Sequence, residues 1–344
     1  MKNTSDQLSK RIIKISLSVL LALCALVALV LIGFIGYAML PVSAYYGASE
    51  RAFEIPGLSD NFVPQGFCYD EERDYFLISG HFSNDEASPI YIVDRASGEL
   101  VKRVSLKKPD GEDFTGHSGG VALWGDYVYV AGGASNCLFV FSYSDLLTAD
   151  TASYIGKFSL KASDDDLIRA SCVTVEGGYL TVAEFYDGGA YLTLDSHKIT
   201  TTAGDKNNAM ALVFEMSESA EFGIKPEAIR AYSLPDKVQG VCYDGERVYL
   251  STSYGLSHSF IYEYDTTQAN AEGVYTLFGQ NLPLFSLDSA CLVGEYRLPP
   301  MSEEIVILDG RLYTMCESAC NKYIFGKFTA GKWCYSTDLS AMKK

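Results

Sequence analysis

Apolar and polar residues alternate over short stretches through most of the chain after residue 50. The clearest example is VQGVCYDGERVYLSTSYG at residues 238–255. Two β-rich runs flank Asp244 and Gly245 in this stretch, and glycine accepts the positive φ that a tight hairpin turn needs. The pattern predicts a β-hairpin.

The same pattern occurs four more times, in VPQGFCYDEERDYFLISG, HSGGVALWGDYVYVAGG, ASCVTVEGGYLTVAEF and EEIVILDGRLYTMCES. Further strand-like runs follow the hairpins, and the fourth runs of four units end alike in RVSL, KFSL, AYSL and EYRL. Four-stranded units that repeat around a ring are typical of a β-propeller, in which closure removes exposed sheet edges. We therefore predict an all-β domain with five four-stranded blades.

Two features of this architecture stay open at the level of sequence. The inserts at residues 196–208 and 266–287 are each long enough for an extra hairpin, so a sixth blade is an alternative. The last unit, with YIFGKFTAG as its expected third strand, lacks a clear fourth strand. RAFEIPGL, which begins at Arg51, is the expected closing strand, and KWCYSTDL near the C-terminus is the alternative.

The segments QGFCYDEERDYFLIS, IYIVDRASGELVKRVSL and QGVCYDGERVYLSTS resemble bacterial repeat propellers of the YVTN-repeat, NHL-repeat and strictosidine-synthase-like types. The resemblance covers residues 51–335. It also extends to uncharacterised surface proteins with a single membrane span. It implies the architecture only, because these families offer no catalytic or binding motif that matches this chain residue by residue.

Residues 15–40 form an apolar run without a charged residue, which is long enough to cross a bilayer with some tilt. We expect a cytoplasmic N-terminus at residues 1–14, a transmembrane signal-anchor helix at 15–40, a linker at 41–50 and an extracytoplasmic propeller at 51–344. Basic residues precede the run, and the positive-inside rule places the large domain outside the cell membrane. Cleavage of a signal peptide after Ala44 is the alternative, although the apolar run exceeds the usual signal-peptide length.

The chain has a formal charge of −16, and its first residues are basic, so the large domain is more acidic than the whole. An acidic domain argues against nucleic acid as a partner. It suits a small-molecule, glycan or protein ligand that is neutral or cationic, and it suits a bound metal ion. Near the C-terminus, Cys316, Cys320 and Cys334 lie close in sequence, and an exported domain can pair two of them.

The propeller geometry also predicts where a binding site lies. The first strand of each hairpin lines the central channel, so the residues that enter it meet the loops after the second strand at one channel mouth. The polar candidates for ligand binding at this mouth are Gln65, His81, His117, Ser171, Gln239, Tyr254, Glu304 and Glu317.

A histidine that faces carboxylates can act as a general base. The catalytic candidates are accordingly His117, Glu304 and Glu184, with a channel hydrogen bond as the alternative role for His117. Glu303, Glu304, Glu184 and Glu317 are candidate ligands for a divalent cation such as calcium, which prefers oxygen. Because neighbouring strand residues point to opposite faces, only one of Glu303 and Glu304 can face the channel.

Three functions are compatible with these features. The chain contains no Walker loop, HExxH motif or CxxC pair, which favours a membrane-anchored ligand- or protein-binding module over an enzyme. A metal-dependent hydrolase or lactonase with its site at the channel mouth is the alternative. The third possibility is a non-catalytic scaffold that docks a membrane partner. A fold alone does not decide among them.

Overall fold

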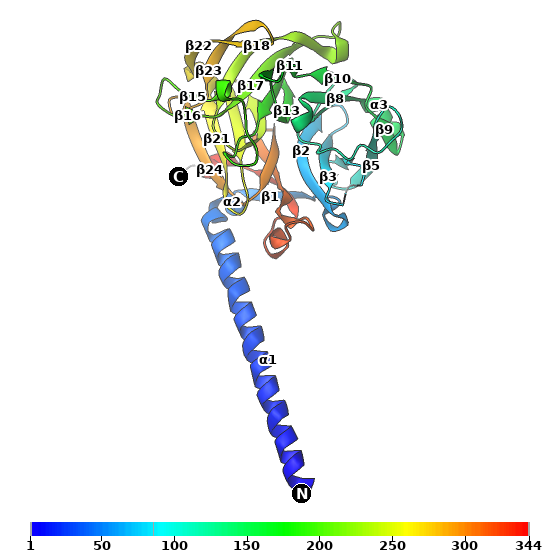
Figure 1. The fold of residues 1–344 in the computed structure, drawn as a ribbon, viewed down its shortest axis with the longest axis vertical. Coiled ribbons are helices and arrows are strands. Elements are labelled where there is room, and N and C mark those ends of the chain that lie inside the picture. The colour runs from blue at the N-terminus through cyan, green and yellow to red at the C-terminus, as the bar shows by residue number, and fades with distance from the viewer. Residues whose placement is uncertain (1, 85, 343–344) are drawn as a thin grey trace.

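The computed structural model describes residues 2–84 and 86–342, and it contains a five-bladed β-propeller that follows one long N-terminal helix (Figure 1). The prediction of an all-β fold with five blades is confirmed. The innermost strands of the blades are β2, β6, β13, β19 and β25, and they surround the central channel.

Each blade is a sheet whose main strands run in order from the channel to the rim of the propeller. Blade 1 contains β2 (Phe62–Asp70), β3 (Tyr75–Phe82), β4 (Pro89–Asp94) and β5 (Leu100–Lys107). Blade 2 contains β6 (Val121–Trp124), β7 (Tyr127–Ala131), β8 (Cys137–Ser142) and β10 (Gly156–Ser159). Blade 3 contains β13 (Ala170–Glu176), β14 (Tyr179–Glu184), β17 (Ala209–Met216) and β18 (Ile224–Leu234). Blade 4 contains β19 (Val238–Asp244), β20 (Arg247–Thr252), β21 (Ser259–Asp265) and β24 (Leu292–Leu298). Blade 5 contains β25 (Ser302–Leu308), β26 (Arg311–Cys316), β27 (Trp333–Thr337) and β1 (Ser49–Glu54).

Each blade begins with the predicted hairpin, and apolar side chains join the blades. In blade 4, Asp244 pairs with Arg247 across a turn in which Gly245 has a φ of 58°. Five clusters of buried apolar side chains fill the spaces between successive blades, as Phe67 and Phe76 do between blades 1 and 5. Burial of this apolar area stabilises the ring, because no single four-stranded sheet can cover both of its faces.

Both candidate closing segments belong to the last blade. The N-terminal strand β1 is the outermost strand and pairs antiparallel with β27, which contains most of KWCYSTDL. The expected third strand YIFGKFTAG is wrong, because those residues form turns and the short 3-10 helix Phe325–Phe328. The ring is thus closed by strands from the two ends of the propeller sequence.

The insert at residues 266–287 adds edge strands to a blade and the insert at 196–208 forms a separate hairpin, so neither makes a sixth blade. β22 (Asn270–Leu277) and β23 (Gln280–Ser286) form a hairpin within the sequence of blade 4, but β23 pairs in parallel with β18 of blade 3. β9 (Thr151–Ser153) joins blade 1 at β5 in the same way. Two small hairpins, β11 (Lys161–Ser163) with β12 (Asp166–Leu167) and β15 (Ile199–Thr200) with β16 (Lys206–Asn207), form separate two-stranded sheets.

The N-terminal helix α1 (Lys2–Met39) projects from the propeller beside α2 (Ser43–Gly47) (Figure 1). It contains the one segment of the described chain that is long and apolar enough to cross a membrane. The segment expected as a linker, residues 41–50, packs against the ring through Val42 and Tyr45. Val42 and Tyr45 are buried between blades 4 and 5, and the Tyr45 hydroxyl lies 2.5 Å from that of Thr314. The remaining α-helix is α3 (Tyr143–Thr148).

Candidate functional site

One buried carboxylate closes the middle of the central channel. Glu304 lies on β25, and its side-chain oxygens accept backbone N–H bonds from Phe67 at 2.7 Å, Val121 at 2.8 Å and Val173 at 3.0 Å. These donors belong to the innermost strands of three other blades. Gly120 allows this approach, because a Cβ there would lie 2.4 Å from the Glu304 carboxylate. Glu304 therefore joins four of the five blades.

The chemistry of Glu304 reflects two opposing effects. Burial raises the pKa of this carboxyl to about 8, while the three backbone N–H donors lower it. Along the channel, the residues on one side of Glu304 surround one hollow, and the residues on the other side surround a second hollow. Glu304 itself lines neither, so the structure does not place it in the predicted site with His117.

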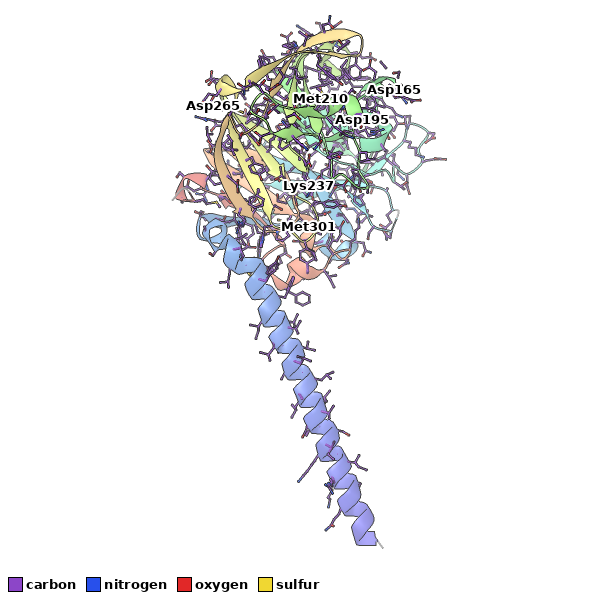
Figure 2. The ribbon with its side chains drawn as sticks, turned by 60° about the vertical axis from the view of Figure 1, so that its left-hand side comes forward. Asp165, Asp195, Met210, Lys237, Asp265 and Met301 are labelled. Atoms are coloured by element: carbon purple, nitrogen blue, oxygen red, sulfur yellow. The ribbon has the colours of Figure 1, made fainter. Side chains whose placement is uncertain are left out.

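The larger hollow is a cavity of about 1010 Å³ at the channel mouth where the innermost strands begin. Met301, which lines the cavity, lies at the end of the propeller from which α1 projects, and Asp165 lies toward the opposite end (Figure 2). Seven of the eight residues expected to bind ligand line it, and only Glu304 does not. These seven are Gln65, His81, His117, Ser171, Gln239, Tyr254 and Glu317.

Two buried glutamates face this cavity. Glu303 is 2% exposed, and its Oε1 has no hydrogen-bond partner within the described part of the chain. Glu317 accepts a hydrogen bond of 3.0 Å from the Gln65 side chain. Burial, and then the neighbouring Glu317, raise the pKa of Glu303 well above its usual range. Burial also raises the pKa of Glu317 to about 7, although Lys322 and Gln65 act in the opposite direction.

A pair of histidines occupies another part of the wall. The rings of His81 and His117 lie 4.6 Å apart, and Nδ1 of His81 has no hydrogen-bond partner among the described residues. Burial, His117 and Lys322 lower the pKa of His81 to about 3, and burial and Lys322 lower that of His117. Both imidazoles are therefore neutral near pH 7. The neighbours of His117 are another histidine and a lysine, and not Glu304 or Glu184 as expected.

Aromatic side chains complete the cavity. Phe185 contacts Tyr191 and Tyr254 with ring centroids 5.4 Å and 5.9 Å apart, and Tyr323 lines the cavity from the last blade. Four residues of this wall were not predicted from the sequence, namely Phe185, Tyr191, Lys322 and Tyr323. Lys322 and Tyr323 lie in residues 317–331, which were expected to contain a strand. The signal that could have revealed them is the length of this segment, which suits a loop at the channel mouth.

Glu184 has a different environment from the predicted one. It is fully buried at the end of β14, where Oε2 lies 2.7 Å from Nδ1 of His197. It also accepts backbone N–H bonds from Arg169 and Met210. His197 comes from the polar insert, and these contacts connect the insert to blade 3. Glu184 does not line the cavity, so it is not brought together with His117 or Glu317.

Residues 116–120, GHSGG, match the GxSxG pattern of serine hydrolases, and this match was missed in the sequence. In those enzymes the serine lies exposed on a turn between a strand and a helix. Ser118 instead lies fully buried in the extended segment before β6, and its hydroxyl has no partner in the described chain. The match therefore does not form a nucleophile elbow.

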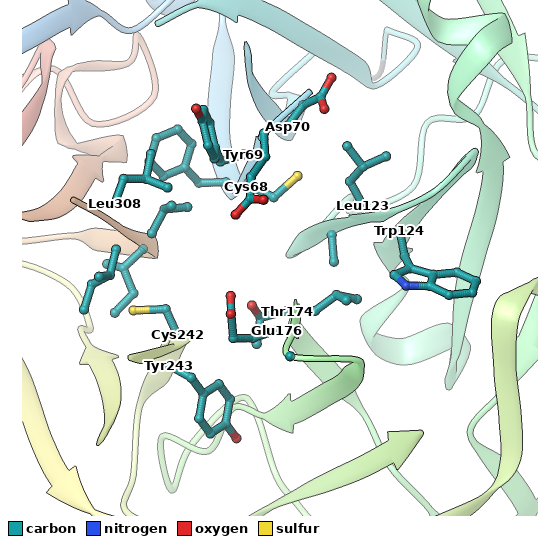
Figure 3. A pocket seen from close by; sticks show the side chains of 18 of the residues that line it. Cys68, Tyr69, Asp70, Leu123, Trp124, Thr174, Glu176, Cys242, Tyr243 and Leu308 are labelled. Carbon is teal, nitrogen blue, oxygen red and sulfur yellow. The ribbon is translucent and has the colours of Figure 1, made fainter. Parts of the chain in front are cut away.

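The smaller hollow, of about 410 Å³, lies at the hairpin end of the channel, where its wall includes the turn residues Glu71, Gly125 and Gly177. Its wall includes Cys68, Glu176 and Cys242, which Figure 3 shows around the opening. Burial, and then Glu71, raise the pKa of Glu176. None of the predicted site residues lines this pocket.

Two of the sequence hypotheses concern metal and disulfide chemistry. Among residues 2–84 and 86–342 no three His, Cys, Asp or Glu side chains come together as a metal-binding group. Of the four glutamates proposed as ligands, only Glu303 and Glu317 share the cavity wall. Cys316, Cys320 and Cys334 are buried free thiols in this structure, so none of the pairings that the sequence allows is formed among them.

Comparison with known proteins finds distant structural matches only. No protein-family model matches the chain, and no curated protein matches it. Similar solved structures include the glutaminyl cyclase of Myxococcus xanthus, with 13% identity, a TM-score of 0.44, and coverage of 84% of this chain and 94% of that one. A putative glucose dehydrogenase from Thermus thermophilus has 13% identity, a TM-score of 0.42, and coverage of 84% and 98%. BamB from Moraxella catarrhalis has 9% identity, a TM-score of 0.32, and coverage of 79% and 84%.

Proposed function

We propose that this protein is a membrane-anchored, extracytoplasmic binding module whose cavity takes a small organic molecule with a cationic group. The observation that carries the proposal is the pair Glu303 and Glu317. Both are buried at the cavity wall, and Oε1 of Glu303 has no partner within the described residues. A buried carboxylate without a partner is costly unless it is protonated or meets a cation. An ammonium group of a ligand would supply both a cation and hydrogen-bond donors to these carboxylates.

The rest of the wall suits an organic cation better than a bare metal ion. A volume of about 1010 Å³ greatly exceeds what one ion occupies and is typical of sites for small molecules. Phe185, Tyr191, Tyr254 and Tyr323 present aromatic rings, whose faces attract ammonium groups. The two histidines are neutral near pH 7 and do not oppose a cation.

The location follows from α1 and from the basic residues that precede its apolar part. Lys10, Arg11 and Lys14 lie before the apolar run, so the positive-inside rule favours a cytoplasmic N-terminus. The propeller and its cavity then lie outside the cytoplasm, at the membrane surface. An uncleaved anchor agrees with the packing of Val42 and Tyr45, which hold the helix against the ring.

A thermal-shift panel on the purified full-length protein tests this function. The panel pairs ammonium compounds with neutral isosteres, for example phenethylamine with phenethyl alcohol, at about pH 8. We expect ammonium members to raise Tm, their isosteres to leave it unchanged, and the effect to disappear in Glu303→Gln. Stabilisation by calcium chloride alone would instead favour the metal-dependent hydrolase. No shift with any compound or ion would leave a scaffold for a membrane partner.

A further inference from the structure

The helix α1 contacts the same face of the propeller on which the cavity opens. The ring of Phe34 lies 6.3 Å from that of Phe325, and the ring of Tyr37 lies 5.9 Å from that of His258. Phe325 belongs to the loop between β26 and β27, and His258 to the loop between β20 and β21. Both loops also supply cavity-lining residues, including Tyr323 and Tyr254. The anchor therefore leaves the molecule beside the cavity mouth.

The position of the bilayer can be estimated from α1. A hydrocarbon core needs about 20 helical residues, and a headgroup layer of roughly 5–7 Å lies on each side of it. Counted from residue 15, where the apolar run begins, the outer hydrocarbon boundary falls near Phe34. Phe325 contacts this residue, so the loop that contains it reaches the boundary. Tyr37 is 67% exposed, and its place is the headgroup layer, where tyrosine is enriched.

Large apolar side chains are exposed around the same mouth. They come from the loops after β14, after β20 and after β26, and we call them the apolar rim. The rim consists of Tyr191, Leu192, Tyr254, Leu256, Ile324 and Phe328, which are 45–61% exposed. Three of the five blades thus present apolar residues on the face that carries the anchor.

The connection between anchor and ring fixes this orientation. Residues 40–48 pass directly from α1 through the 3-10 helix Leu40–Val42 and α2 into β1. Val42 and Tyr45 are each 1% exposed within the cluster between blades 4 and 5. Since the segment is packed, the propeller cannot turn the rim away from the bilayer without breaking these contacts.

We propose that the apolar rim rests in the headgroup layer of the membrane that α1 spans, so that the cavity opens onto the lipid surface. The occupant of the rim is the bilayer itself. Partial burial of the apolar rim in the bilayer would remove its side chains from water, and this removal is the driving force for interfacial binding. A consequence, which rests on the proposed function, is that the cationic ligand reaches Glu303 from the headgroup layer.

Depth-dependent fluorescence quenching tests the rim directly. The full-length chain is reconstituted in nanodiscs of phosphatidylcholine with brominated acyl chains, without any cavity ligand. Leu256→Trp and Ile324→Trp report on the rim, and Val274→Trp is the matched control, because Val274 is 70% exposed on β22 at the propeller edge. Unsubstituted protein gives the baseline from Trp124 and Trp333.

We expect brominated lipid to quench both rim tryptophans well beyond the baseline and beyond the control, while aqueous iodide quenches only the control. Rim tryptophans that iodide quenches and brominated lipid does not would overturn the proposal, since the rim would then face water. Protection from both quenchers would overturn it as well, because a protein partner or a second copy would then cover the rim. Neither outcome depends on whether the cavity binds an ammonium compound.

Discussion

Two adjacent buried glutamates, Glu304 in the middle of the channel and Glu303 at its mouth, differ in the hydrogen bonds that the protein supplies to them. Glu304 receives three backbone hydrogen bonds, whereas Oε1 of its neighbour Glu303 receives none from the described residues. Both side chains are at most 2% exposed. The difference teaches that burial and a raised pKa do not by themselves mark a functional residue. What distinguishes the two is whether the surrounding protein already supplies the hydrogen bonds.

The largest effect is expected for Glu304→Ala. The substitution leaves three buried backbone N–H groups without an acceptor, and each such loss costs about 1–3 kcal/mol. We expect the free energy of unfolding to fall by at least about 3 kcal/mol, measured by denaturant unfolding of the full-length protein. Glu304→Gln keeps one acceptor oxygen, so its stability should lie between those of Glu304→Ala and the unsubstituted protein. Wild-type stability in Glu304→Ala would show that Glu304 does not hold the blades together.

A smaller loss is expected for Gly120→Ala. The new Cβ would meet the Glu304 carboxylate and also lie 2.6 Å from Cα of Cys172, so blades 2 and 3 must move apart. Overpacking of this kind costs about 1–3 kcal/mol. Gly47→Ala is the control, because a Cβ at residue 47 has nothing within 4 Å. Equal unfolding curves for the two variants would contradict the close approach.

Some features of the fold and of the candidate site can be predicted from the sequence, and others cannot. The repeated hairpins predict the five blades, because the positive φ at turns such as Gly245 and the alternation of apolar residues are local signals. The same repeats place Gln65, His81, His117 and Glu317 at one mouth. The expectation that only one of Glu303 and Glu304 can face the channel is wrong, since a bulge between Ser302 and Ile305 lets Glu304 reach the middle of the channel while Glu303 lines its mouth. Lys322 and Tyr323 were missed because their loop has no repeat counterpart.

Binding at the mouth should depend on pH. An ammonium ligand prefers the ionised carboxylate, and burial raises the pKa of Glu317 to about 7. As the pH falls through about 7, the carboxyl takes up a proton and the affinity should decrease by up to about tenfold per pH unit. Titration of a stabilising ammonium compound between about pH 6 and pH 8 measures this. An affinity that does not change with pH would exclude the pair as the cation site.

Stability without ligand should have the opposite dependence on pH. The pKa values of Glu303 and Glu317 are higher in the folded protein than their ordinary value of 4.5. Their protonated forms therefore favour the folded state below about 4.5, and that contribution is lost as the pH rises toward and beyond 7. We expect Tm to decrease less between about pH 5 and pH 8 in Glu303→Gln than in the unsubstituted protein. An identical decrease in both proteins would contradict this assignment.

The smallest effect is expected at the hairpin end of the channel. Glu176 has a raised pKa and lines the smaller pocket, and Glu304 lies between this pocket and the cavity. Glu176→Gln should leave the Tm shift produced by ammonium compounds unchanged. A reduced shift would mean that the two hollows act together, and the separation by Glu304 would be wrong.

The most direct test of a ligand role for the mouth carboxylates compares Glu303→Gln with the unsubstituted protein by thermal unfolding, with and without a stabilising ammonium compound at about pH 8. If these carboxylates serve a ligand, the ligand-free Tm of Glu303→Gln stays the same or rises, and the ligand-induced increase disappears. A lower ligand-free Tm together with a retained increase would contradict that role, because Glu303 would then be as structural as Glu304.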